Sequence, residues 1–501
     1  MQTANRRFWR NAYFWILSAY VASRVAYFAA GIRFNVKPLS SFFQIADPLL
    51  LRTRLFETLL YLHTQPPGFN LMIGLVLKVF PSSYSPAFHF IYLACGVSLC
   101  FTLYRMMRIF EVRPWIAASL TILFLVSPGV VLFENLLIYE YPLMALLCVS
   151  AVLLHRLFQR PDALYAVLFF SCLAILLYIR ALFHLGWFIL IAAFVLWRLK
   201  GYRRMIVTAA AIPFLLSLAI FVKNAILIHS FTSSTWMEFA AETITTHQLT
   251  DQEHEHLIQA GVLSPMSRIS AYDPLSSFAG KISLPPPSGI PVVDQLNDST
   301  GRINYNNAGY LELYPFYVHE GVEIILHYPK AYVRSIVRAW FAYFLPTSDF
   351  PFFDENKAHI GKLDRLFNIV VFGQWRDASD RKNLRKMDAA GKTYELPLYV
   401  GTWLLLGLPL LFCMGVSIVW RKVRTAGWGQ PATSLLTYLL FQIAFITVLV
   451  NFLSSFENNR YRLPVDPFFV TLLGIAIERG TAWRRSKSER GSIEGRTLQL
   501  R

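Results

Sequence analysis

The sequence predicts an all-α, polytopic membrane protein. Its 501 residues are 55% hydrophobic and only 15% charged, whereas soluble domains carry about 25% charged residues. The mean hydropathy is +0.43. Apolar runs of about 20 residues recur along the chain, and a helix of that length crosses the roughly 30 Å hydrocarbon core of a bilayer. We expect about ten transmembrane helices, within a range of about nine to thirteen, and one large extracytoplasmic loop.

The expected spans follow from the apolar runs, taken in chain order. They cover residues 12–32, 85–104, 114–133, 138–156, 163–179, 182–198, 205–229, 396–420, 432–454 and 464–478. One further apolar run, 69–80, contains Lys78 and stops before Pro81. It is short for a span and suits a re-entrant or interfacial helix. The first run has a basic start but lacks an A-x-A-like cleavage site, so we expect it to be retained as a helix.

Basic residues set the topology, because cytoplasmic loops are enriched in Lys and Arg. Arg6, Arg7 and Arg10 place the N-terminus inside. If 69–80 does not cross the membrane, the other basic clusters beside spans also fall inside: Arg105/Arg108/Arg113, Arg156/Arg160, Arg198/Lys200/Arg203/Arg204, Arg421/Lys422/Arg424 and Arg484/Arg485/Lys487. The outer face then holds residues 33–84, 134–140, 230–395 and 455–463. All of the candidate functional residues lie on this face.

This topology divides the chain into four parts. Residues 1–229 form an N-terminal transmembrane module, whose first outer loop is 33–84. Residues 230–395 form the large extracytoplasmic loop. Residues 396–478 supply the C-terminal transmembrane helices, and residues 479–501 form a basic cytoplasmic tail.

The large loop contains a predicted interfacial helix and a histidine-rich stretch. Residues 327–346 combine apolar and basic side chains at helical spacing, which is typical of a helix in the headgroup region. The apolar stripe is Tyr332, Ile336, Trp340 and Phe344, and the basic stripe is Arg334 and Arg338. The histidine-rich stretch contains His247, His254 and His256, with acidic residues among them. Such a cluster can bind a metal, but solvated helices often have the same composition, and that interpretation is favoured.

Charge and cysteine usage exclude two other classes. The formal net charge is +17, but much of the Lys and Arg sits in short loops beside apolar runs, where it sets topology. We therefore expect membrane lipids and no nucleic acid as partners. All five cysteines fall inside apolar runs, so neither a disulfide framework nor a thiolate metal site is expected.

Asp47 is the sharpest candidate for chemistry. It follows the first span on the outer face and precedes Pro48. A carboxylate there can act as general base toward an acceptor hydroxyl or hold a divalent cation. It can equally cap the next helix, with Pro48 as the first helical residue. Further along the same loop, His63 is followed by Pro66 and Pro67, which fix the backbone as the chain re-enters the membrane.

Two further outer turns carry ionisable residues close to hydrocarbon. Glu134 and Glu140 flank the turn FENLLIYEYPL. Carboxylates in that position are costly and are functional candidates by default, although an acid in an aromatic belt looks the same. Arg460 and Arg462 in SFENNRYRLPVDP suit a lipid phosphate, which guanidinium groups bind bidentately, or ordinary anionic headgroups. Lys223, at the outer end of the seventh span, either snorkels or meets phosphate.

The layout resembles that of the GT-C glycosyltransferases. The nearest branch is the family-39/83-like group, which contains protein O-mannosyltransferases and the lipid A aminoarabinose transferase. The resemblance covers the whole chain in layout but only three short motifs in sequence: the first-loop acid Asp47, the Pro-Pro turn of HTQPPGFN, and the late Arg-Tyr-x-x-Pro from Arg460 to Pro464. The chain departs from the family where Pro48 replaces a second acid and where the second acidic turn lacks the usual arginine.

The resemblance implies an inverting glycosyltransferase that moves a sugar from a polyprenyl-phosphate donor to a hydroxyl of a glycan, lipid or protein. The enzyme would be a multi-pass protein of the cytoplasmic (inner) membrane, with its active site facing the periplasm or exterior. The roles would be catalytic base for Asp47, donor-phosphate binding for Arg460 and Arg462 with Lys223 as a further candidate, and acceptor or cation support for Glu140, Glu134 and His63. A divalent cation, Mg²⁺ or Mn²⁺, held by Asp47 and Glu140, is the one cofactor left open.

Three other classes compete with this interpretation. An O-antigen ligase- or polymerase-like enzyme and a membrane acyltransferase also use outer loops that contain Arg and His. A lipid-linked sugar transporter would place charged residues at mid-membrane, often in matched repeats. The expected spans hold few ionisable groups, and the polar candidates gather on one face, so the pattern favours an enzyme.

Overall fold

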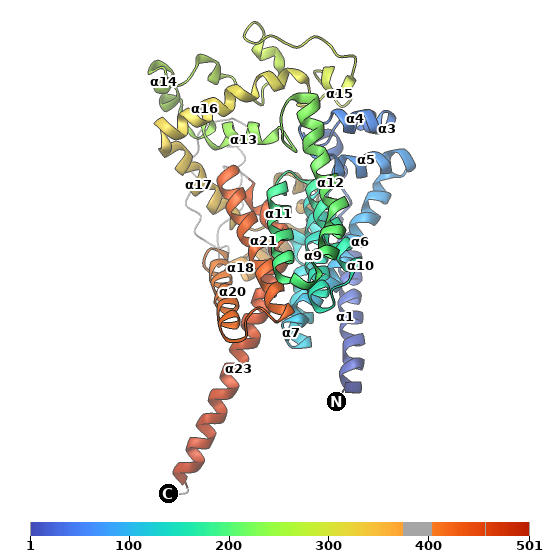
Figure 1. Ribbon diagram of the computed structural model, residues 1–501, viewed down its shortest axis with the longest axis vertical. Helices are drawn as coiled ribbons and strands as arrows, with labels where there is room; N and C mark the ends of the chain where they lie inside the picture. The colour runs from blue at the N-terminus through green and yellow to red at the C-terminus, as the bar shows by residue number, and fades with distance from the viewer. Residues whose placement is uncertain (1, 374–402, 456, 500–501) are drawn as a thin grey trace.

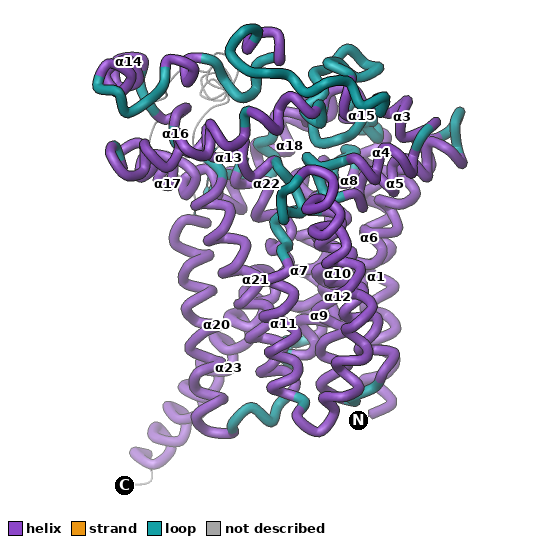
Figure 2. Tube along the Cα trace, turned by 45° about the horizontal axis from the view of Figure 1, so that its top comes forward, coloured by secondary structure: helices purple, strands orange, loops and turns teal. Residues whose placement is uncertain are grey.

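The computed structural model describes residues 2–373, 403–455 and 457–499, and within these ranges the regular secondary structure is helical, with two isolated β-bridges and no sheet. Figure 1 shows a bundle of long helices, with shorter helices and loops gathered at its upper end. In the second view the two layers separate clearly, and the start of α1 and the end of α23 lie at the far end of the bundle from the short helices (Figure 2). We call the layer of short helices the cap. It comprises residues 33–79, 128–134, 230–372 and 458–462.

The bundle is built from ten helices, which overlap the ten apolar runs of the sequence. They are α1 (Gln2–Ala29), α6 (Tyr84–Ile109), α7 (Pro114–Leu125), α9 (Glu140–Gln159), α10 (Ala163–Ile179), α11 (Leu185–Arg198), α12 (Arg203–Ile228), α20 (Leu404–Ala426), α21 (Pro431–Leu453) and α23 (Asp466–Gln499). The first residues of the expected span 396–420, and residues 374–395 of the large loop, lie outside the described part.

Five of these helices are long and apolar enough to cross a membrane by themselves. They are α6, α9, α12 with the turn before it, α20 and α21. A sixth candidate is α7 together with α8 (Pro128–Glu134), two segments bent by 59°. The break falls where Pro128 removes a backbone donor. Several long apolar helices indicate a multi-pass membrane protein, with five or six candidate spans among the described residues. The count of ten stays a prediction.

The cap contains most of the described residues of three segments that charge placed on the outer face, 33–84, 230–395 and 455–463, and it also contains α8, most of which was expected within the span 114–133. The first outer loop forms α2 (Pro38–Ser41), α3 (Pro48–Thr53), α4 (Leu55–Tyr61) and α5 (Pro67–Val79). The short apolar run 69–80 is therefore α5, and it lies in the cap beside α3 and α4 rather than along the bundle (Figure 2). Backbone hydrogen bonds join Asn35 of this loop to Asn135 and Leu137 of the second outer turn.

The large loop folds around its own aromatic core. Its helices are α13 (Trp236–Ile244), α14 (Asp251–Gln259), α15 (Pro291–Asp294), α16 (Tyr314–His327), α17 (Pro329–Tyr343) and α18 (Asp354–Phe372). The core contains Phe239, Phe278, Tyr310, Tyr314 and Tyr317, packed with smaller apolar side chains. The last outer turn forms the short helix α22 (Asn458–Arg462). This packing gives the cap a defined shape over the bundle.

The interfacial helix forms as α17, and its two arginines pair with other residues of the large loop. Arg334 lies 2.9 Å from the Glu253 carboxylate, and Arg338 donates to the Gln248 side chain at 2.7 Å. The exposed apolar residues are Val333, Val337 and Trp340, whereas Phe344 is buried. The predicted stripe is thus shifted, because acceptors elsewhere in the large loop pair with the two arginines.

Candidate active site

A cavity of about 920 Å³ lies between the cap and the bundle. Its walls come from the first outer loop (Phe43, Gln44, Gln65), the start of α9, the turn after α10, the large loop, the end of α21 and the last outer turn. Every segment that the sequence placed on the outer face contributes to it or packs beside it. A shared cavity of this size at the meeting point of several segments is where a substrate is expected to bind.

Two arginines that line this cavity, Arg180 and Arg460, pair with one buried glutamate behind them, Glu140, and we call these three residues the floor. Glu140 is the first residue of α9, Arg180 follows the last residue of α10, and Arg460 lies in α22. Arg180 Nη1 is 3.3 Å from Glu140 Oε1, and Arg460 Nε is 3.5 Å from the same oxygen. Glu140 is fully buried and Arg460 is 1% exposed. A single carboxylate therefore holds two guanidinium groups that come from separate helices.

Donor groups on this floor remain unused. Arg460 Nε and Nη1 donate no hydrogen bond to any residue in the described ranges, and Glu140 Oε2 accepts none. Arg460 Nη2 lies 2.9 Å from the carboxylate of Glu457, which also lines the cavity. Buried polar atoms are nearly always hydrogen-bonded, so these three atoms are candidates to bond a water molecule or a ligand. An oxyanion matches the donors that Arg460 leaves free.

Aromatic side chains surround the two arginines. The Arg180 guanidinium lies over the Tyr139 ring at 4.9 Å and over the Tyr461 ring at 4.2 Å. Such stacking fixes the plane of a guanidinium group without occupying all of its hydrogen-bond donors. Across the cavity, Phe43 and Trp236 stack at 4.6 Å. The cavity thus combines a cationic floor with flat apolar surfaces.

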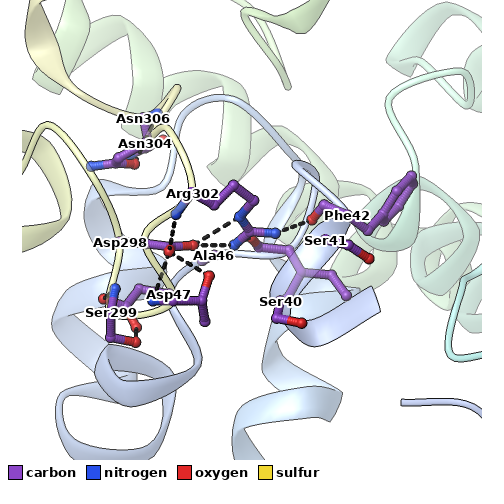
Figure 3. Close-up of polar contacts among 12 residues, drawn as sticks. Ser40, Ser41, Phe42, Ala46, Asp47, Asp298, Ser299, Arg302, Asn304 and Asn306 are labelled. Carbon is purple, nitrogen blue, oxygen red and sulfur yellow. Dashed lines mark hydrogen bonds and ion pairs between the residues drawn. The ribbon is translucent and has the colours of Figure 1, made fainter. Parts of the chain in front are cut away.

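Asp47 lies outside the set of cavity-lining residues. Its carboxylate caps α3 by accepting from the Leu49 backbone N–H at 2.8 Å. It also accepts from the Ser299 backbone N–H at 2.9 Å and from the Ser299 hydroxyl. Figure 3 shows this contact next to the pair formed by Arg302 and Asp298. The capping role is therefore present and extends to the large loop, while the catalytic role of Asp47 stays a prediction.

His63 and Lys223 join the first outer loop to neighbouring segments. His63 Nδ1 is 2.9 Å from the Thr235 hydroxyl, and Nε2 is 3.1 Å from the Asn306 carbonyl oxygen. Burial lowers the pKa of His63 to about 3, so the ring is neutral at physiological pH. Lys223 donates to the Leu62 carbonyl at 2.5 Å. Neither side chain is among those that line the cavity.

Glu134 and Arg462 form separate structural networks. Arg24 of α1 lies 2.7 Å from Glu134, which also accepts from Tyr20 at 3.0 Å and from Tyr141. Arg462 pairs with Asp466 at 2.9 Å and donates to the carbonyl groups of residues 343 and 345. Both side chains are buried away from the cavity. Of the six supporting and phosphate-binding residues expected from the sequence, the structure pairs Glu140 with Arg460 at the cavity and places Lys223 near His63 away from it.

The residues proposed for a cation do not form a ligand set. The Asp47 oxygens accept hydrogen bonds from Leu49 and Ser299, whereas Glu140 faces guanidinium groups. No group of three or more His, Cys, Asp or Glu side chains is placed to hold a metal ion within the described ranges. His254 of the histidine-rich stretch lies against Ser267 at 2.8 Å. We derive no catalytic step through a metal.

Sequence reasoning missed Arg180. It stands in the two-residue turn between the expected spans 163–179 and 182–198, which the topology places on the outer side. A lone arginine at the end of an apolar run, on the side that lacks basic clusters, is a detectable exception to the positive-inside rule. Comparison with known proteins adds no assignment: no family model, no curated protein and no solved structure matches the chain.

Proposed function

We propose that the protein is an inverting glycosyltransferase, which moves a sugar from a polyprenyl-phosphate donor to an acceptor hydroxyl at the outer face of the cytoplasmic membrane. The observation that carries the proposal is the floor of the cavity. Arg180 and Arg460 are held there around Glu140, with guanidinium donors unused, where the cap meets the apolar bundle. A phosphate attached to a membrane lipid has the charge and the location that this floor requires.

The donor phosphate would bind to Arg180 and Arg460. Charge-assisted hydrogen bonds from guanidinium groups to phosphate are strong and geometrically specific. The same groups would stabilise the negative charge that develops as the bond between sugar and phosphate breaks. Glu457 now occupies one face of Arg460, and the incoming phosphate would replace its carboxylate. Glu140, which pairs with both arginines, would keep their guanidinium groups oriented toward the phosphate.

The lipid chain and the sugar would occupy different walls of the cavity. Leu182, Met237, Leu449 and Leu453 supply an apolar side. Next to these wall residues of α21, Val448 and Phe452 are exposed on the outside of the molecule, where lipid would surround the bundle. This side suits lateral entry of the polyprenyl chain. The aromatic surfaces suit the flat face of a sugar ring, and the acceptor would enter from the side of the large loop.

Inversion follows from this arrangement. The phosphate leaves toward the floor, so the acceptor oxygen must approach the anomeric carbon from the opposite side. Attack from that side inverts the anomeric centre. The acceptor can be a glycan, a lipid or a protein, because the floor recognises only the donor.

The test compares arginine variants of the full-length protein in lipid nanodiscs. A panel of polyprenyl-phosphate-linked hexoses and pentoses is offered, and sugar release is measured by mass spectrometry. Arg460→Gln and Arg180→Gln should each lower turnover by about 10²-fold or more, the usual loss when one charge-stabilising donor is removed. The matched control is Arg268→Gln, since Arg268 also lines the cavity but pairs with Glu255 in solvent.

The control variant should retain turnover close to that of the unmodified protein. Binding of the free polyprenyl phosphate, measured by native mass spectrometry, should weaken in the first two variants alone. Turnover that survives both substitutions, or an unmodified protein that neither binds the lipid phosphate nor releases any sugar, would overturn the proposal.

A further inference from the structure

A second buried acid pairs with a histidine in the large-loop wall of the cavity. Glu242 lies near the end of α13, and His247 lies in the turn at residues 246–248. His247 Nε2 is 3.2 Å from Glu242 Oε1. Glu242 is 1% exposed and also accepts from the Ala271 backbone N–H at 2.9 Å. Both residues line the cavity whose floor holds Arg180 and Arg460.

The hydrogen bonds of His247 determine which tautomer its imidazole ring adopts. Nε2 faces Glu242 and, at 3.4 Å, the Ser270 hydroxyl. A carboxylate accepts only, so Nε2 carries the proton. Nδ1 then holds a lone pair, and it has no hydrogen-bond partner in the described ranges. With 26% of its side chain exposed, His247 can present this lone pair to a molecule in the cavity.

Charges around His247 support this arrangement. Burial acts to lower the pKa of His247, but the Glu242 carboxylate and, more weakly, Asp273 outweigh burial and raise the pKa above its ordinary value. The helices packed against this turn carry the following titratable groups: Glu238 and Glu242 on α13, His319, Glu320, Glu323 and His327 on α16, and Lys330, Arg334 and Arg338 on α17. Asp273, in the loop before α15, also acts on the ring. Arg334 and Arg338 are engaged with Glu253 and Gln248, so Glu242 is the group that acts directly on the ring.

We propose that His247 accepts the proton of the acceptor hydroxyl, and that Glu242 is the positioning residue that orients it. This inference rests on the proposed glycosyl transfer. It moves the proton-accepting role from Asp47, whose oxygens are engaged outside the cavity, to a pair that lines the cavity itself. The orienting carboxylate and imidazole follow the logic by which a buried acid fixes a histidine tautomer and stabilises the imidazolium.

The step balances in atoms and charge. The acceptor O–H bond breaks as its proton moves to Nδ1 of His247, and the acceptor oxygen forms a bond to the anomeric carbon. The bond from that carbon to the phosphate oxygen breaks, and its electron pair leaves with the polyprenyl phosphate toward Arg180 and Arg460. The imidazolium beside Glu242 then returns its proton to water or to the departing phosphate.

The first test is the pH profile of sugar transfer. His247→Gln should lower kcat by about 10²-fold or more, in the range of general-base losses, and should remove the acidic limb of the profile. Glu242→Gln should move that limb to lower pH, because the charge that raises the histidine pKa is gone. If Glu242 had a purely structural role, Glu242→Gln would reduce turnover without shifting the acidic limb of the pH profile. His254→Gln is the matched control, since His254 lines the same cavity but bonds to Ser267, and its limb should stay in place.

The second test measures the protonation of His247 beside Glu242 directly, without relying on sugar transfer. Diethyl pyrocarbonate modifies neutral imidazole, and peptide mass spectrometry reports the modification of His247 at each pH. The midpoint in the full-length protein should lie above that of an ordinary histidine, and Glu242→Gln should lower it by about one pH unit or more, as expected when an opposite charge is removed. An unshifted midpoint would overturn the pairing.

The two proposals can fail separately. If His247→Gln keeps its turnover and its acidic limb while Arg460→Gln loses activity, the role of His247 is wrong and the glycosyl transfer stands. If the unmodified protein releases no sugar from any donor of the panel, the glycosyl transfer fails, and the role of His247 fails with it even where the midpoint shifts as expected.

Discussion

Two glutamates at the ends of the second outer turn differ in how completely they are bonded. Glu134 and Glu140 are both fully buried, and each pairs with arginine. Glu134 is engaged at both oxygens by Arg24, Tyr20 and Tyr141. Glu140 leaves one oxygen without a partner, and its arginines line a cavity. The comparison predicts that Glu134 serves mainly to stabilise the fold, whereas Glu140 serves the proposed binding of the donor phosphate.

The largest expected effect lies at the satisfied site. Glu134→Gln leaves the Arg24 guanidinium buried without its counter-charge. Breaking a buried ion pair by removing one partner costs about 3–5 kcal/mol. In mixed micelles, this variant should therefore reach its unfolding midpoint at a markedly lower mole fraction of SDS. Tyr20→Phe removes one hydrogen bond from the same network and serves as the milder control. Equal stability of Glu134→Gln and the unmodified protein would remove the basis of the comparison.

Glu140→Gln should show the opposite balance of effects. Arg180 keeps its aromatic neighbours and Arg460 keeps Glu457, so stability should fall less than in Glu134→Gln. Sugar release should fall by about 10²-fold, because both guanidinium groups lose the acid that orients them toward the phosphate. Turnover and SDS unfolding are measured on the same preparation. A large loss of stability with unchanged turnover would mean that Glu140 is structural as well.

Asp47 provides the next and smaller test. Asp47→Ala removes the cap of α3 and the contact to Ser299, and losing a helix cap costs about 0.5–2 kcal/mol. Asp47→Asn keeps a capping oxygen, so we expect a smaller change in stability and turnover close to that of the unmodified protein. A loss of turnover in Asp47→Asn, with donor-lipid binding retained, would restore Asp47 as the base and contradict the role given to His247.

The smallest effect is expected at the rim of the cavity. Arg268 and Glu255 form a solvent-exposed pair at 2.8 Å, and exposed pairs contribute about 0–1 kcal/mol. Glu255→Gln should therefore change neither the SDS midpoint nor sugar release beyond experimental error. A clear loss of turnover would show that the rim, and not only the floor, recognises the substrate.

Much of the architecture could be predicted from local pattern. Apolar runs gave the helices, and the side on which Lys and Arg accumulate grouped the outer segments that form the cap. The candidate site was only partly predictable, because its chemistry depends on pairing between distant residues. Arg24 and Glu134 are 110 residues apart in sequence, and no local motif around either residue predicts their pairing. Arg460 and Arg462 are two positions apart with similar surroundings, yet only Arg460 faces the cavity, since a short helix directs the two side chains differently.

The floor of the cavity also has a consequence for the order of synthesis. Glu140 and Arg180 are made early, whereas Arg460 follows the last long outer segment and lies close to the C-terminus. A chain that is still being inserted, or one that ends before α22, carries an acid and one arginine but lacks the second cation that completes the site. Under the proposed function, donor lipids would meet a competent site only after α22 has joined α9 and α10, so insertion of this late segment would itself control the onset of activity.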